Sequence, residues 1–395
     1  MRKYAIVNSI LFFLIVFSPG FMKGARLLHL ITKDFHGSSL SGYFESHERP
    51  SFSKHSYATR DYQKYFEAWF NSHVSLRAFY IRIYNQIQFT LFKLSNRIIG
   101  KNDDIFEMIY INAECGLVSG CNFDNPKNYK KLKEYVRHLE NVQNKLQKIG
   151  KQFLFYTTPS KATQHFNNIP LKYRLKKQSD YITPYYYLKE LLSNTSINYI
   201  DSRDFLSTDG TPDFYNTGIH WARPIEQRVS QAIVENLSER SNKKLPRIVL
   251  GELKSSDLPI KRDADVYNLV NMIQNPHGAY YEYEAQVKAE SESLPNFLIQ
   301  GGSFAEGFYV FDYAGYTKQS YKFFYGRELR NNDGTKTEIK KWKEMPFEEI
   351  LDNVDYVIVE LNESVIHKFS NGFVKYLDSF LNSYRPKNIK SKEIK

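Results

Sequence analysis

The sequence has few of the features that mark a metal-binding or nucleic-acid-binding protein. Its 395 residues include two cysteines, and its ten histidines show no spacing suited to a metal site. A zinc shell needs four ligands, so two cysteines without a nearby histidine pair leave it unfilled. A glycine-rich phosphate loop, a dinucleotide fingerprint and a helix-turn-helix signature are also missing. We therefore expect no metal, no cofactor and no nucleic-acid partner.

What the chain has in excess is positive charge and aromatic rings. The formal net charge is +11, and the 30 Tyr and 29 Phe bring the aromatic share to 16%. A basic surface suits an anionic glycan or a membrane surface, and tyrosine is a usual wall for a sugar ring. The alternative reading of the rings is an ordinary core combined with the residue usage of an AT-rich genome.

The first residues resemble an export signal. Arg2 and Lys3 precede a mostly apolar run over residues 4–22, which is a charged segment followed by a hydrophobic one. About 19 apolar residues can just span a bilayer. No clear small-x-small cleavage site follows, so an uncleaved anchor over residues 1–24 is favoured over a removed signal peptide. In either case, we expect the rest of the chain to lie outside the cytoplasm.

An exported chain folds in an oxidising compartment, which bears on its two cysteines. Cys115 and Cys121 are six positions apart around Gly116 and Gly120. Such a pair could close a small flexible loop. We expect a disulfide between them, with two free thiols as the alternative.

The sequence after residue 24 predicts a linker over residues 25–60 and a single domain over 61–385, with helices at 61–97. A disordered basic tail is expected over 386–395. Helical and strand-like patterns alternate from residue 129 onward, which favours a central, mostly parallel sheet with helices on both faces. The fold class is therefore a three-layer α/β/α domain. The expected helices cover 129–149, 185–192 and 225–237; the expected strands cover 152–158, 197–200, 297–299 and 354–361; short strands are expected within 98–125.

One strand ends in a pattern suited to nucleophilic catalysis. Residues 298–300 are followed by Gly301, Gly302 and Ser303. Such a junction can place a serine hydroxyl at the carboxyl edge of the sheet, where α/β sites lie. The backbone N–H groups of Ser303 and of Gly302 or Gly301 could then face a developing oxyanion. The alternative is an ordinary glycine-serine turn.

A second segment offers the base that a serine nucleophile needs. His220 follows a polar, glycine-containing turn and precedes Trp221. Histidine is the most frequent general base, and serine is a weak nucleophile without one. The alternative is a histidine satisfied by a backbone carbonyl.

Together these segments resemble the alginate O-acetyltransferase family (AlgJ/AlgX-like), whose catalytic domain is SGNH-hydrolase-like. The segment ending at Lys161 is similar to the family's Pro-x-Lys strand end. Thr217 to Trp221 occupies the position of its Asp-x-His-Trp motif, and Gly302 to Phe304 that of its nucleophile block. The matching segments are, in chain order, residues 65–77, 100–106, 155–161, 217–221, 302–304 and 355–363.

The resemblance implies a serine acyltransferase that acetylates a polysaccharide. Ser303 would be acylated, with His220 as its base, and would pass the acetyl group to a sugar hydroxyl. The implied partners are the polysaccharide acceptor and a membrane-bound O-acyltransferase that supplies acetyl groups. The implied location is the periplasmic or extracellular face of the membrane.

The chain departs from the family at the acid of the triad. The family's acid lies two residues before its histidine, where this chain has Gly218, and Thr217 fills the position three before. Asp213 and Asp201 are the nearest candidates for this acid, and Asp213 is the one placed in the triad. A backbone carbonyl could orient His220 instead.

Two other functions remain open from the sequence. A serine acetylesterase would share the acyl-enzyme and differ only in using water as the second nucleophile. A non-catalytic glycan-binding or assembly protein on the same scaffold would explain the glycine at position 218.

Overall fold

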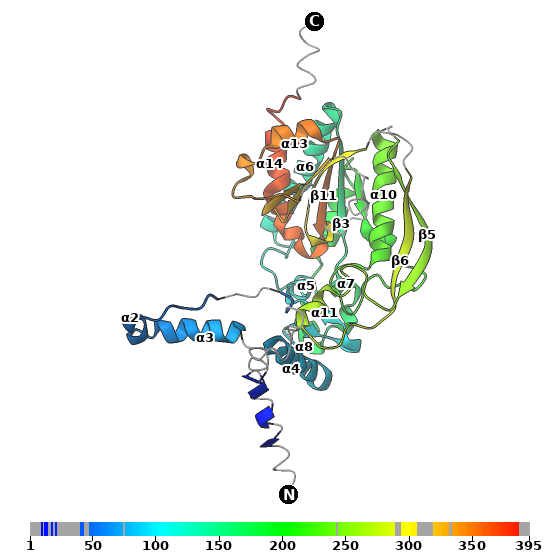
Figure 1. The fold of residues 1–395 in the computed structure, drawn as a ribbon. Helices are drawn as coiled ribbons and strands as arrows, with labels where there is room; N and C mark the ends of the chain where they lie inside the picture. The colour runs from blue at the N-terminus through cyan, green and yellow to red at the C-terminus, as the bar shows by residue number, and fades with distance from the viewer. Residues whose placement is uncertain are drawn as a thin grey trace. The chain divides into compact units, whose positions relative to one another are not determined.

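The chain forms two compact units, one of residues 1–97 with 266–275 and one of residues 98–265 with 276–395 (Figure 1). The predicted bounds of the catalytic domain, 61–385, stay a prediction. The computed structural model describes residues 9–10, 12–14, 17–18, 20–21, 40–42, 47–73, 76–241, 244–288, 294–305, 319–331 and 334–386.

The secondary structure described in the first unit is helical. Helices α3 (Asp61–His73) and α4 (Arg77–Phe92) confirm the helical pattern predicted here, and a short helix α2 (Lys54–Ala58) lies within the predicted linker. One side of α4 packs against the stretch 266–275. There the Asn85 side chain donates to the Val270 carbonyl at 2.6 Å.

The predicted anchor, residues 1–24, falls largely outside the described ranges. In the part of the chain that the structure describes, no helix is long and apolar enough to cross a membrane. The anchor stays a prediction. The predicted tail also lies outside these ranges apart from Pro386.

The second unit is built on a seven-stranded sheet with the order β10-β9-β8-β7-β11-β3-β4. From β8 to β4 the neighbouring strands are parallel, and β9 and β10 extend the sheet antiparallel. The predicted mixed α/β fold with a central, mostly parallel sheet is thus confirmed. The strands are β3 (Gln152–Thr158), β4 (Tyr199–Asp201), β7 (Asn296–Gly301), β8 (Gln319–Phe324), β9 (Glu328–Asn331), β10 (Lys336–Glu338) and β11 (Tyr356–Asn362).

Helices cover both faces of this sheet (Figure 1). On one face lie α6 (Pro126–Lys148), α13 (Phe347–Asn353) and α14 (Phe373–Phe380), and on the other lies α10 (Arg223–Ser241). Helix α6 begins where the Asn125 side chain accepts the Lys127 N–H, with proline at the first helical position.

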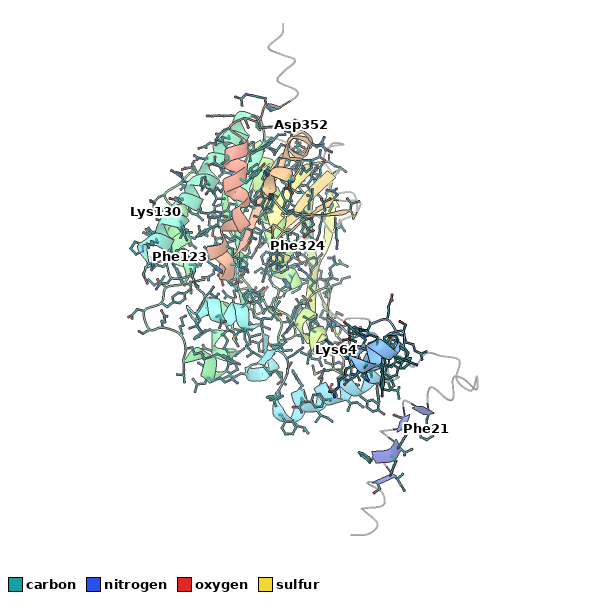
Figure 2. All side chains as sticks on the ribbon, turned by 90° about the vertical axis from the view of Figure 1, so that its left-hand side faces the viewer. Phe21, Lys64, Phe123, Lys130, Phe324 and Asp352 are labelled. Carbon is teal, nitrogen blue, oxygen red and sulfur yellow. The ribbon has the colours of Figure 1, made fainter. Side chains whose placement is uncertain are left out.

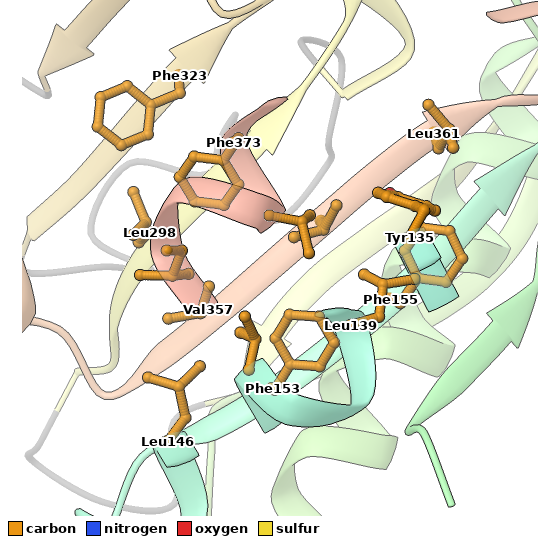
Figure 3. Packing of buried hydrophobic residues seen from close by; sticks show 14 of the residues in the cluster. Tyr135, Leu139, Leu146, Phe153, Phe155, Leu298, Phe323, Val357, Leu361 and Phe373 are labelled. Carbon is orange, nitrogen blue, oxygen red and sulfur yellow. The ribbon is translucent and has the colours of Figure 1, made fainter. Parts of the chain in front are cut away.

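The central strands are apolar on both faces because both are covered. Figure 3 shows the packing on one face, where Phe153 of β3, Leu298 of β7 and Val357 of β11 meet Leu139 of α6 and Phe373 of α14. All five side chains are almost completely buried. Truncating a residue of this kind to alanine typically costs about 2–5 kcal/mol. The packing fixes where β3, β7 and β11 end, and hence where the side chains that follow them lie.

The segment 98–125 departs from the prediction. Its strands are only β1 (Ile98–Ile99) and β2 (Ile105–Phe106), and the run continues as helix α5 (Met108–Glu114). Ile111 and Cys115 are four residues apart and are both buried in one apolar cluster. This is the period of a helix face, so the second half of an apolar run read as strand is helical.

A second region that the sequence did not predict is the two-stranded antiparallel ribbon of β5 (Arg247–Ser256) and β6 (Tyr280–Lys288), beside α10 (Figure 1). The remaining elements are short: η1 (Lys101–Asp103), α7 (Lys161–Gln164), η2 (Phe166–Asn168), α8 (Leu171–Arg174), α9 (Pro184–Leu192), η3 (Ser202–Phe205), α11 (Asp265–Val270), η4 (Ser303–Ala305), η5 (Trp342–Glu344) and η6 (Glu363–Gly372).

The predicted disulfide is wrong. Cys115 and Cys121 are both free and buried. The Cys121 sulfur lies 3.1 Å from Nδ1 of His367, whereas Cys115 belongs to the apolar cluster of α5. Burial raises the pKa of the Cys121 thiol to about 11, which keeps it protonated. The two thiols stay unbonded because each is packed among different neighbours, although the loop between them is short.

Candidate active site

Ser303 lies directly after the carboxyl end of β7, as the sequence predicted. Gly301 ends the strand, and Ser303 begins the turn η4. A Cβ at position 301 would stand 2.7 Å from the Ala305 side chain and 2.9 Å from that of Glu360. Only glycine permits so close a turn, and this turn carries the hydroxyl to the sheet edge.

The structure brings His220 to this serine. Its Nε2 lies 2.7 Å from the Ser303 hydroxyl oxygen, and the side chain is nearly buried. Phe304 lies against the imidazole with 4.8 Å between ring centroids. The loop is held at its flanks by the buried side chains of Ile219 and Trp221, so the imidazole has a fixed direction.

The side chain that contacts His220 on its other nitrogen is Asp265, which the sequence did not indicate. One oxygen of its carboxylate lies 2.6 Å from Nδ1 of His220, and the other accepts the Ile219 backbone N–H at 3.0 Å. The carboxylate thus contacts both the ring and the backbone of the histidine loop. With Nδ1 donating to Asp265, Nε2 is the acceptor that the serine proton requires.

Asp213, the favoured candidate, lies elsewhere. Its carboxylate accepts the Ser207 backbone N–H at 2.9 Å and faces Arg228 at 3.5 Å. It therefore stabilises the turn before the histidine loop. The assignment of Asp213 as the partner of His220 is corrected to Asp265. No motif spacing marks Asp265, because it reaches the histidine from 45 residues further along the chain.

The predicted oxyanion donors are only partly available. The Gly302 N–H donates to the Glu360 carboxylate at 2.7 Å. Gly301 lies within β7, and its carbonyl accepts the Tyr325 N–H at 2.9 Å. Among the described residues, no partner is found for the Ser303 N–H. Of Gly302 and Ser303, the two predicted donors that follow the strand, Ser303 is therefore the one whose N–H can meet a developing charge.

Glu360 is a buried carboxylate beside the turn that carries Ser303. Besides Gly302, it accepts the Thr158 hydroxyl at 2.7 Å. Burial raises its pKa, against the opposing effect of these two hydrogen bonds. The side chain links the ends of three adjacent strands, because Thr158 ends β3, Glu360 lies in β11 and Gly302 follows β7.

A cavity of about 270 Å³ opens beside Ser303. Its wall includes Tyr325, whose hydroxyl lies 2.7 Å from the Ser303 oxygen. Tyr325 follows Phe324, the end of β8 (labelled in Figure 2). No sequence pattern indicated this residue. The cavity wall also carries the exposed cationic side chains of Arg327 and Lys368.

A buried lysine holds the loop that leads to His220. The Lys161 amine contacts the Asp104 carboxylate at 2.6 Å and donates to the carbonyls of Gly218 at 2.7 Å, Tyr215 at 2.8 Å and Ile105 at 2.9 Å. Burial lowers the pKa of this amine, and the Asp104 carboxylate opposes that shift. This arrangement gives the Pro-x-Lys segment a physical role in placing the histidine loop.

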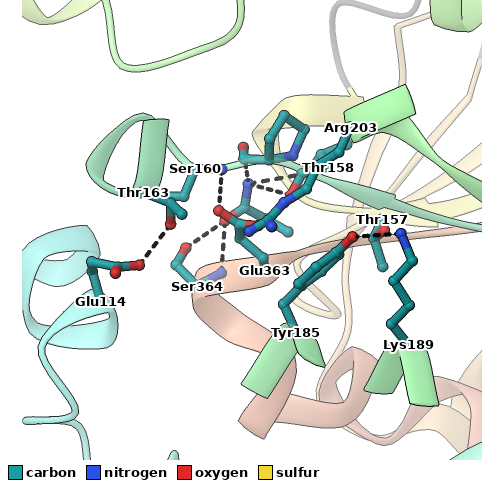
Figure 4. A network of polar contacts seen from close by, with 12 residues as sticks. Glu114, Thr157, Thr158, Ser160, Thr163, Tyr185, Lys189, Arg203, Glu363 and Ser364 are labelled. Atoms are coloured by element: carbon teal, nitrogen blue, oxygen red, sulfur yellow. Dashed lines mark hydrogen bonds and ion pairs between the residues drawn. The ribbon is translucent and has the colours of Figure 1, made fainter. Parts of the chain in front are cut away.

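The start of that segment is fixed by a second polar network (Figure 4). The Glu363 carboxylate accepts the Ser160 backbone N–H at 2.7 Å and the Arg203 guanidinium at 3.0 Å. The Asn362 amide donates to the Thr158 hydroxyl at 3.1 Å. These contacts tie the end of β3 to the end of β11, next to Glu360.

The arrangement is suited to acyl transfer. A serine, a histidine and a carboxylate in a hydrogen-bonded row form the constellation that activates a serine hydroxyl. The cavity beside the serine leaves space for an acyl group and its acceptor.

No protein-family model matches the sequence, and no curated protein matches it. Solved structures to which the chain is similar include the O-acetyltransferase domain of Pseudomonas putida AlgJ, at 13% identity over 72% of this chain and 99% of that chain, with a TM-score of 0.45. Pseudomonas aeruginosa AlgX has 12% identity, with 71% and 67% of the chains covered and a TM-score of 0.37. Bacillus cereus PatB1 has 10% identity, with 60% and 90% covered and a TM-score of 0.38. Two of these structures, AlgJ and AlgX, bear the names of the family that the sequence motifs resemble.

Proposed function

We propose that this chain is an O-acetyltransferase that acetylates hydroxyl groups of an exported polysaccharide through a Ser303 acyl-enzyme. The observation that carries the proposal is the row of contacts from Ser303 to His220 at 2.7 Å and from His220 to Asp265 at 2.6 Å. The polysaccharide acceptor follows from the family resemblance of the motifs.

In the first half-reaction, the Ser303 oxygen attacks the acetyl carbonyl carbon and its proton passes to Nε2 of His220. The tetrahedral intermediate then expels the donor's leaving group, which takes that proton. In the second half-reaction, a sugar hydroxyl attacks the acetyl-serine and gives its proton to His220. Collapse of this intermediate returns the proton to the serine oxygen. Asp265 keeps the imidazole in the required tautomer and stabilises its protonated form.

The proposal includes a membrane-bound O-acyltransferase as the source of acetyl groups and a site outside the cytoplasm. Both rest on the family resemblance and on the N-terminal apolar run. The lack of an acid at position 218 is the feature that favours a non-catalytic protein. In this proposal, Asp265 takes the place of that acid, because its carboxylate contacts His220.

The test is turnover of a chromogenic acetyl ester, with and without an acceptor oligosaccharide. Acceptor-dependent transfer would support the transferase. Release of acetate to water alone would indicate an esterase, and no turnover would indicate a binding protein. Ser303→Ala and His220→Ala should each abolish transfer, and the double variant should be no worse than either, because the two residues act as one unit.

A matched control is Ser383→Ala, which removes an exposed serine hydroxyl outside the site and should leave transfer unchanged. In cells, mass spectrometry of the polymer should show acetylation with the natural chain and none with the Ser303→Ala copy. Acetylation that survives Ser303→Ala would overturn the proposal.

A further inference from the structure

Tyr325 occupies a backbone conformation that tyrosine rarely adopts. It lies in the turn between β8 and β9, where the Arg327 N–H donates to the Phe324 carbonyl at 2.9 Å. The two central residues, Tyr325 and Gly326, have φ of +51° and +63°. This is the pattern of a type I′ turn, which favours glycine, asparagine and aspartate at both positions. A bulky side chain at positive φ is unfavourable, and such residues cluster at active sites.

The turn holds this tyrosine against the nucleophile block. The Tyr325 N–H donates to the Gly301 carbonyl at 2.9 Å. Its ring lies over Gly302, where a Cβ would stand 2.8 Å from the ring carbon Cε1. Its hydroxyl oxygen lies 2.7 Å from the Ser303 oxygen. The backbone, the ring and the hydroxyl thus contact three consecutive residues, so the unfavourable conformation gives the side chain one defined position.

The hydrogen-bond roles at Ser303 follow from counting donors. A serine hydroxyl has one proton and two acceptor lone pairs. In the tautomer whose Nδ1 donates to Asp265, that proton points to Nε2 of His220. The remaining contact is therefore one in which the Tyr325 O–H donates to the serine oxygen.

The oxyanion site needs such a donor. Serine acyl transfer usually uses two or more N–H or O–H groups to stabilise the tetrahedral oxyanion. The Gly302 N–H is engaged with the Glu360 carboxylate at 2.7 Å, which leaves the Ser303 N–H in need of a second donor.

We propose that the Tyr325 hydroxyl is a catalytic oxyanion donor of this site. The inference rests on the proposed function, since it concerns the same acyl-enzyme. As the Ser303 oxygen bonds to the carbonyl carbon, its proton passes to His220 and its lone pair becomes the new bond. The carbonyl oxygen, which is bonded to the same carbon as the serine oxygen, then takes up the negative charge. The Tyr325 O–H transfers its hydrogen bond to that oxygen, keeps its own proton, and shares the charge with the Ser303 N–H.

The test is Tyr325→Phe, which keeps the ring over Gly302 and removes only the hydroxyl. With 4-nitrophenyl acetate as the probe, kcat should fall by about 10²–10³-fold, the usual loss for one oxyanion donor, while KM stays nearly unchanged. The matched control is Tyr186→Phe, which removes an exposed hydroxyl of the same unit and should leave both constants unchanged.

A second variant separates catalysis from folding. Tyr325→Asn places a residue that the turn favours. The melting temperature of this variant should therefore equal or exceed that of the natural chain, while its kcat should fall as in Tyr325→Phe. A Tyr325→Phe enzyme with unchanged kcat would overturn the inference. A rise in KM with kcat unchanged would count as the same outcome. Ser303→Ala is measured in parallel: if it too leaves turnover intact, the proposed function fails, and if it alone abolishes turnover, only the role of Tyr325 fails.

Discussion

Gly218 lies so close to the backbone of Asp263 that a Cβ at position 218 would stand 2.7 Å from the Asp263 carbonyl oxygen and 3.1 Å from its carbonyl carbon. The Thr217 hydroxyl donates to the same carbonyl at 2.7 Å. Two residues further along, this segment delivers Asp265 to His220. The missing side chain at position 218, the family's acid position, therefore leaves room for the backbone of Asp263. The same segment places Asp265 beside His220.

Restoring the family's acid should consequently do harm. We expect Gly218→Asp to lower acyl transfer and to reduce the free energy of unfolding by about 1–3 kcal/mol, the usual cost of inserting atoms into a packed site. The new side chain would displace the segment that carries Asp265. Activity with 4-nitrophenyl acetate and urea unfolding would measure both effects.

The control for this substitution is Gly278→Ala, because a Cβ there would meet only Tyr280 at 3.7 Å or more. It should be tolerated. A Gly218→Asp enzyme with higher activity than the natural chain would contradict the role assigned to Asp265.

The acid itself is tested by Asp265→Asn. The amide lacks the negative charge that stabilises protonated His220 and can impose the wrong tautomer, so kcat should fall by up to about 10⁴-fold. Asp213→Asn should change kcat by no more than about twofold, since Asp213 contacts Ser207 and Arg228 instead. Measuring both variants on one acetyl ester decides the assignment, and equal losses would refute it.

Lys161 should be required for both stability and activity. Lys161→Met leaves the Asp104 carboxylate and several carbonyls buried without their cation. Breaking a buried ion pair typically costs about 3–5 kcal/mol, and the histidine loop should lose its fixed position. Chemical unfolding and turnover would show the two losses together. The exposed Lys172 provides the control variant Lys172→Met, which should behave as the natural chain does.

The stability of the protein should fall as the pH rises, through Asp263. Burial, with added repulsion from Glu226, raises the pKa of the Asp263 carboxyl to about 8 from its ordinary 3.8. Between these two values the folded state retains a proton that the unfolded state has released, so the free energy of unfolding decreases with rising pH. Asp263→Asn cannot titrate, so it should remove this component of the slope.

Urea unfolding from pH 4 to pH 8.5 would measure the effect. Above pH 8 the Asp263→Asn variant should be more stable than the natural chain by at least about 1 kcal/mol, since one pKa unit corresponds to about 1.4 kcal/mol. The exposed Asp257 gives a control, Asp257→Asn, that should keep the natural slope. Parallel pH curves for the natural chain and Asp263→Asn would show that Asp263 is ionised in the folded state.

Much of the fold could be predicted from local patterns. The apolar face of α6 and the apolar runs of β3, β7 and β11 can be recognised within short stretches of sequence. Burial on one face repeats apolar residues at a fixed spacing, and burial on both faces makes them continuous. Where the same apolar character fits two structures, the prediction failed. The run after Ile105 became helix α5 instead of strand, because its contacts to the apolar cluster are set by distant residues.

The sequence by itself determined the turn at Ser303 and the loop at His220 as candidate site segments, because each lies in a local pattern of glycines, aromatic residues and strand ends. Only the tertiary structure decided what surrounds them. Asp265 and Tyr325 belong to no local motif, and the Gly302 N–H is taken by Glu360 from a neighbouring strand. A catalytic contact requires two atoms about 3 Å apart, and for residues dozens of positions apart that distance is set by packing of the whole unit.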